Sequence, residues 1–108
     1  MPRVKRALYR ISIAREGTVR RGSEVASCSI TELTTLGMGL STDLCVSQGD
    51  ELEVTFPLTG RDPICCHIFV THTIPPRVGG RIVSISSEDY SQLTRFIEQH
   101  AATTLSAL

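Results

Sequence analysis

The stretch Glu51-Leu-Glu-Val-Thr-Phe56 alternates polar and apolar residues more regularly than any other part of the chain. Side chains of a β-strand point alternately to its two faces, so this period of two predicts a strand with Leu52, Val54 and Phe56 turned inward. One apolar face and one charged face are typical of an antiparallel sheet that is half exposed to water. The stretch therefore predicts a mainly β fold.

Strand-like runs lie on both sides of this stretch, and turn residues separate them at intervals of roughly ten residues. In chain order, the predicted strands span residues 10–15, 24–33, 38–41, 51–56, 64–73 and 79–86. The period then changes, and Ser86 or Ser87 is the expected N-cap of a helix. The predicted apolar face of this helix consists of Tyr90, Leu93, Phe96 and Ile97. Six short strands followed by one helix favour a small antiparallel barrel or sandwich.

Composition places the chain among ordinary soluble domains. Its 108 residues fit one domain, and 41% of them are hydrophobic. The formal net charge is zero, whereas proteins that bind long nucleic acids are usually basic, so we expect no such partner. No run approaches the ~20 apolar residues of a membrane helix, and no apolar signal stretch opens the chain. These observations predict a cytoplasmic domain without membrane insertion.

The cysteines fit the same location. Four are present, namely Cys28, Cys45, Cys65 and Cys66. Disulfides are rare in the cytosol, so a reduced state is expected. No Cys-x-x-Cys spacing occurs, and the adjacent pair Cys65-Cys66 would point to opposite faces of a strand, which makes a poor metal clamp.

Two short motifs carry the functional signal. Arg6-Ala-Leu-Tyr-Arg10 precedes the first predicted strand, and Glu32-Leu-Thr-Thr-Leu-Gly37 follows the second. The planar fork of each guanidinium matches a phosphate or the O6/N7 edge of guanine, and a carboxylate can accept from guanine N1–H and N2–H₂. A glycine allows the backbone to approach a ligand closely. Together the motifs are suited to an anionic ligand that carries bases.

In their order and context, the two motifs resemble those of the PilZ family of cyclic di-GMP receptor domains. That family has Arg-x-x-x-Arg before its first strand, matched here by Arg6 and Arg10, and Asp/Asn-x-Ser-x-x-Gly at a later strand end. Glu32, Thr34 and Gly37 match the second motif loosely, because Glu replaces Asp or Asn and Thr replaces Ser. The stretch from residue 79 to residue 89 is similar to the family's last strand running into its helix.

The resemblance implies a small six-stranded antiparallel split β-barrel with one C-terminal α-helix. Residues 1–9 would form a flexible basic arm that contains most of the first motif, residues 10–100 the barrel domain with its helix, and residues 101–108 a frayed tail. It also implies a receptor rather than an enzyme, with cyclic di-GMP as ligand and no cofactor or metal. The arm would reorder on binding and control motility, exopolysaccharide synthesis or attachment through a protein partner or a fused effector domain.

The changes at Glu32 and Thr34 keep a second hypothesis open. The added methylene and methyl would alter the site, and a diverged member of the family would then act as a protein-interaction module that no longer binds the nucleotide. Under that hypothesis, Arg6→Ala would leave partner binding largely intact, whereas it would abolish nucleotide binding in a receptor.

Other chemistry-bearing residues are better explained by structure. Cys66-His67 with His72 would need an orienting group and an oxyanion hole to act as a nucleophile, and they fall within a continuous strand pattern. His67 and His72 are five residues apart and would not share a face in a regular strand, so a zinc site is not expected. The remaining charged candidates are expected to be solvated: the pair Glu51 and Glu53, the pair Arg20 and Arg21, and Arg77.

Overall fold

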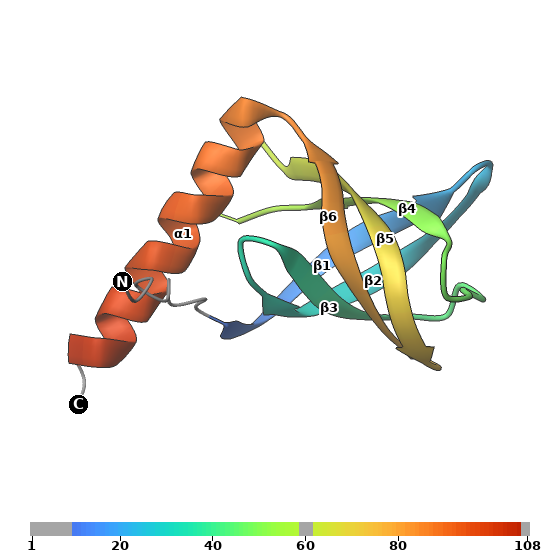
Figure 1. Ribbon diagram of the computed structural model, residues 1–108, viewed down its shortest axis with the longest axis horizontal. Helices are drawn as coiled ribbons and strands as arrows, with labels where there is room; N and C mark the ends of the chain where they lie inside the picture. The colour runs from blue at the N-terminus through green and yellow to red at the C-terminus, as the bar shows by residue number, and fades with distance from the viewer. Residues whose placement is uncertain (1–9, 59–61, 107–108) are drawn as a thin grey trace, which may run out of the picture.

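The chain folds into a closed antiparallel β-barrel with one helix against one end (Figure 1). The computed structural model describes residues 10–58 and 62–106. The elements are β1 (Ile11–Arg21), β2 (Glu24–Leu33), β3 (Gly37–Thr42), β4 (Glu51–Phe56), β5 (Ile64–Ile74), β6 (Arg77–Ile85) and α1 (Ser87–Ser106). Around the barrel the strand order is β1-β2-β3-β6-β5-β4. The prediction of a six-stranded antiparallel barrel with a C-terminal helix is therefore confirmed.

β2 and β4 were both predicted at their observed bounds, β4 from its regular alternation. The prediction for β1 was too short, because it placed a turn at Gly17, which in fact lies inside the strand. A Cβ atom added at Gly17 would meet the Thr55 carbonyl oxygen at 2.5 Å and the Phe56 Cβ at 2.9 Å. Gly17 is thus explained by the close approach of β4 rather than by a turn.

Alternate side chains of all six strands fill the barrel interior. Leu52, Val54 and Phe56 are buried, as the period of two predicted. The other fully buried large side chains are Val19, Ile30, Leu33, Leu40, Ile64, Ile68, Val70, Leu93 and Ile97. Each contributes about 1.5–3 kcal/mol by leaving water, so this core is the main source of stability.

Helix α1 is capped and tied to the barrel at its first turn. The Ser86 hydroxyl accepts a hydrogen bond from the Asp89 N–H at 3.0 Å, which identifies Ser86 as the N-cap. The Asp89 carboxylate accepts from the Cys65 N–H at 3.1 Å and so links the helix to β5. Leu93 is buried, but Tyr90, which was predicted on the same face, is 39% exposed. One turn before Leu93, it lies beside Val83 on the outer surface instead of in the core.

Two further findings concern the helix. It continues to Ser106, past residue 100, where the sequence prediction ended it. No helix in the described part of the chain is long and apolar enough to cross a bilayer.

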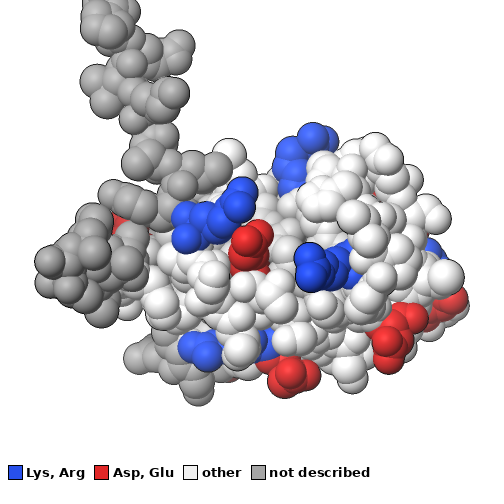
Figure 2. Space-filling view, turned by 90° about the horizontal axis from the view of Figure 1, so that it is seen from below, with Lys and Arg blue, Asp and Glu red and all other residues white. Residues whose placement is uncertain are grey.

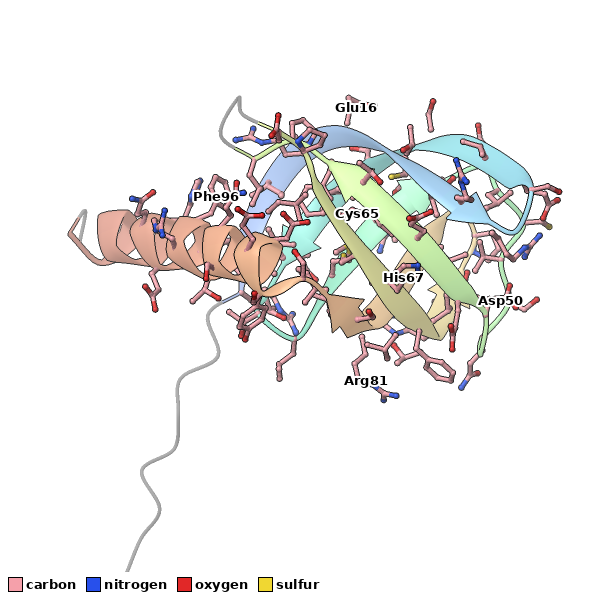
Figure 3. All side chains as sticks on the ribbon, turned by 90° about the horizontal axis from the view of Figure 1, so that it is seen from above. Glu16, Asp50, Cys65, His67, Arg81 and Phe96 are labelled. Atoms are coloured by element: carbon pink, nitrogen blue, oxygen red, sulfur yellow. The ribbon has the colours of Figure 1, made fainter. Side chains whose placement is uncertain are left out.

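Arg21 fastens the loop between β3 and β4 to the β1–β2 hairpin. Its guanidinium donates to the Asp50 carboxylate at 2.8 Å, to the Cys45 carbonyl at 2.6 Å and to the Glu24 carboxylate at 2.6 Å. Asp50 lies at the end of the barrel away from α1 (Figure 3). Arg20 in turn pairs with Glu53 at 3.7 Å. Both arginines therefore have structural partners.

We predict that the Asp50 contacts make stability depend on acid pH. The Ser47 N–H and then the Arg21 guanidinium hold the pKa of the Asp50 carboxyl below its usual value. Because the folded pKa is depressed, the stabilisation is present above the unfolded pKa of about 3.9 and is lost as pH falls through the folded pKa. Asp50→Asn should have a lower Tm than the wild type at pH 7, and this difference in Tm should shrink in acid.

Thermal unfolding of both proteins between pH 7 and pH 2 measures this effect. Asp43→Asn, at an exposed carboxylate on the same loop, is the matched control and should follow the wild-type curve. A gap between Asp50→Asn and wild type that stays constant with pH would contradict the assignment.

Candidate functional site

A groove of about 700 Å³ crosses the outer surface of β2, β3, β6 and β5. Its lining includes a single row of paired residues across five strands. In order around the barrel, this row is Ser12, Glu32, Gly39, Gly79 and His72. The two residues between Glu32 and His72 have no side chains, so Gly39 and Gly79 form a strip of backbone that we call the glycine floor; its Gly79 end is buried beneath the His72 imidazole. Glu32 stands at the Gly39 end and the His72 ring covers the Gly79 end; the Cα atoms of Glu32 and His72 are three strand spacings or roughly 14 Å apart.

Two of the arginines that line the groove lie on β6. Arg77, Gly79 and Arg81 are separated by even numbers of residues and share the outer face of that strand. Figure 3 shows Arg81 projecting outward from the barrel. Among the described residues, three arginines line the groove, namely Arg10, Arg77 and Arg81, against the single acidic residue Glu32. This local excess of positive charge on a neutral chain is suited to a small anion.

On the face seen in Figure 2, basic groups lie on both sides of an acidic one, and further charged groups lie toward the edges. The structure brings the two sequence motifs together, because Arg10 Nη1 lies 3.7 Å from Glu32 Oε2. The two side chains are 70% and 46% exposed, and such an exposed ion pair is worth at most about 1 kcal/mol. A ligand can therefore replace Glu32 as the partner of Arg10 at little cost. Arg6 lies outside the described residues.

Thr34 shapes the turn that follows β2. Its hydroxyl oxygen accepts hydrogen bonds from the N–H groups of Leu36 and Gly37, both at 3.0 Å. The Thr34 N–H donates to the Gly37 carbonyl at 2.9 Å. The hydroxyl of the second motif thus holds the loop between β2 and β3 in a fixed shape next to the groove.

Gly37 is needed for packing between strands. It pairs with Arg81 across β3 and β6, and a Cβ atom added there would collide with the carbonyl oxygen of Gly80. Sequence reasoning connected this glycine with the approach of a ligand. The structure gives a different reason for a glycine at this position, which is the close approach of β6.

Sequence reasoning did not identify Gly39, Gly79, His72 or Arg81 as site residues. His72 was considered there only for a nucleophilic or zinc site. In the structure the imidazole of His72 packs over Gly79, where any added Cβ would collide with the ring. The His72 Nδ1 lies 3.3 Å from the Thr71 hydroxyl. These residues come together on one surface only through the pairing of five strands, which the sequence does not show.

The structure separates the residues of the possible nucleophilic pair. Cys66 is buried in the core, and burial raises the pKa of its thiol to about 12, whereas His67 is exposed on the outer face. Burial also raises the pKa of Cys28 to about 11. Thiols with raised pKa values are poor nucleophiles at neutral pH. Nowhere in residues 10–58 and 62–106 do three or more His, Cys, Asp or Glu side chains gather as a metal site.

Comparison with known proteins gives one family. The PilZ domain family matches residues 4–99 of the chain. No curated protein matches the sequence.

Several solved structures share the fold. The inhibitor of motility MotI/DgrA of Bacillus subtilis superposes with a TM-score of 0.76 at 13% identity; the match covers 92% of this chain but only 52% of that one, so this chain spans about half its length. The PilZ domain of CeSA from a cellulose-synthesizing bacterium gives 0.68 at 13% identity, covering 86% and 98%. The PilZ domain of YcgR from Escherichia coli, solved with cyclic di-GMP, gives 0.71 at 15% identity, covering 96% and 99%.

Proposed function

We propose that this chain, which belongs to the PilZ domain family, binds cyclic di-GMP in the groove above the glycine floor. PilZ domains are non-catalytic receptor domains, and the proposed activity is ligand recognition. The observation that carries the proposal is the placement of Arg10 and Glu32 side by side at the edge of a groove floored by glycine.

Each part of the groove has a chemical counterpart in the ligand. The Arg10 guanidinium can bind a phosphate or the O6/N7 edge of a guanine with two parallel hydrogen bonds. The Glu32 carboxylate can accept from guanine N1–H and N2–H₂, which adenine does not offer in this arrangement. The Gly39 end of the glycine floor lets the flat face of a base approach the backbone. The proposed site therefore selects a guanine-containing cyclic dinucleotide.

Binding would also act as a switch. The ligand would draw Arg10 away from Glu32 and engage Arg6, four residues earlier, so that residues 1–9 take one position on the barrel. A change of surface caused by ordering a segment is a recognised way to control a partner. We propose a cytoplasmic receptor whose partner protein or fused effector domain regulates motility, exopolysaccharide synthesis or attachment.

Isothermal titration with cyclic di-GMP at physiological salt tests the proposal. We expect a micromolar or tighter Kd for the wild type and no heat with GTP. Arg10→Ala removes charge-assisted hydrogen bonds worth about 1.5–3 kcal/mol each, so its affinity should fall at least tenfold. Arg95→Ala, at an exposed arginine of α1 that does not line the groove, is the matched control and should keep the wild-type affinity.

One observation favours the second candidate, a protein-interaction module without nucleotide. Leu36, Val83 and Tyr90 are 59%, 46% and 39% exposed and line a shallow hollow next to the turn of the second motif. Exposed apolar residues that lie together are common at protein contacts. If the titration shows no heat at millimolar ligand while a partner still binds the Arg10→Ala variant, this second function replaces the first.

A further inference from the structure

A second pair of arginines with the spacing of the first motif lies on β6. In Arg77-Val-Gly-Gly-Arg81 the two arginines are four residues apart, as Arg6 and Arg10 are. Their Cα atoms are separated by about 13 Å along an extended strand, with the Gly79 end of the glycine floor between them. Both side chains are exposed, and both line the groove.

Among the described arginines of the barrel, Arg77 and Arg81 lack acidic partners, as does Arg15, which instead donates to the Leu58 carbonyl. Arg10, Arg20 and Arg21 each pair with a carboxylate. In residues 10–58 and 62–106, neither Arg77 nor Arg81 forms an ion pair with a carboxylate. Their charges are therefore available to an anion without the loss of an existing ion pair.

Arg81 is also held in position. Its guanidinium carbon lies 5.2 Å from the centre of the Phe69 ring, in the range of a cation–π contact. The ring orients the guanidinium without neutralising it, unlike a carboxylate. The backbone of β6 pairs with β3 on one side and with β5 on the other. The two arginines therefore belong to a strand that is held at both edges.

We propose that Arg77 and Arg81 are ligand-binding residues that contact the phosphodiester groups of the bound nucleotide from β6. This inference rests on the proposed function and extends it to residues outside both sequence motifs. A ligand seated in the groove has Arg77 toward one end and Arg81 toward the other. A compound with two phosphates engages both guanidiniums at once, whereas a mononucleotide engages only one. The pair thus favours cyclic dinucleotides over mononucleotides.

Titration of single and double variants with cyclic di-GMP and with GMP tests this inference. Arg77→Gln and Arg81→Gln should each weaken cyclic di-GMP binding about tenfold, and the double variant about a hundredfold. The preference for cyclic di-GMP over GMP should fall with each substitution. Arg95→Gln is the matched control, because it removes an exposed arginine away from the groove. Thermal unfolding should show all four variants folded, since both groove arginines are exposed.

The outcomes separate the two proposals. Wild-type binding that is lost in Arg10→Ala but unchanged in Arg77→Gln, Arg81→Gln and the double variant would overturn the role of β6 and leave the proposed function standing. A wild type that binds neither nucleotide would overturn both. Graded loss in the β6 variants with normal binding by Arg95→Gln would establish the second pair.

Discussion

Replacing Gly39 with valine should reduce cyclic di-GMP binding more than a hundredfold and leave the barrel folded. A Cβ atom at Gly39 has its nearest neighbour, the Glu32 Cβ, at 3.5 Å, which is ordinary van der Waals contact. The new side chain would therefore fit the fold but stand on the glycine floor, where the ligand is proposed to lie. Because glycine weakens a strand interior, valine should leave stability unchanged or raise it by about 0.5–1 kcal/mol.

Calorimetric titration and urea unfolding of the same preparation measure both halves of this prediction. Thr18→Val, at an exposed position of β1 outside the groove, controls for adding valine to a strand. Normal affinity in Gly39→Val would show that the ligand does not contact this floor. Loss of affinity together with loss of folding would leave the steric explanation without support.

Replacing Gly37 with alanine should have the opposite result, a large loss of stability. The added Cβ atom would collide with the carbonyl oxygen of Gly80, which belongs to the backbone of β6 and cannot rotate away. Overpacking of this kind costs typically 1–3 kcal/mol, and the fixed backbone should place this variant at the upper end of that range. For a domain of this size, Tm should fall by roughly 10 °C or more.

Urea unfolding of Gly37→Ala and Gly39→Ala gives a matched comparison on one strand. The two substitutions add the same methyl group two residues apart, and only the first meets backbone. Equal midpoints for the two variants would mean that β3 and β6 are not packed as closely at Gly37 as the structure places them.

The sequence predicted the parts of the fold that depend on local periodicity. The bounds of β4 follow from alternation alone, and its buried face follows from the same pattern. The length of β1 did not, because Gly17 is a turn signal when read locally. Its place within the strand depends on β4, which is distant in sequence. Tyr90 was misplaced for a similar reason, since helical spacing does not show where the mouth of the barrel ends.

The candidate site was likewise predictable only in part from the sequence. The order of the two motifs predicted that Arg10 and Glu32 act together, and the structure places them 3.7 Å apart. His72 and Gly79 are more than thirty residues from either motif, so their position beside Gly39 becomes visible only from the pairing of β3, β6 and β5. The spacing of Arg77 and Arg81 was readable in the sequence. Only the barrel shows that both face the groove.

The most direct test of the central claim is the calorimetric titration of the wild-type chain with cyclic di-GMP at physiological salt, beside Arg10→Ala. A ligand held between Arg10, Glu32 and the glycine floor predicts micromolar or tighter binding that is weakened at least tenfold in the variant. Absence of heat at millimolar ligand, or equal affinity in both proteins, would contradict the claim that this groove is a cyclic di-GMP site.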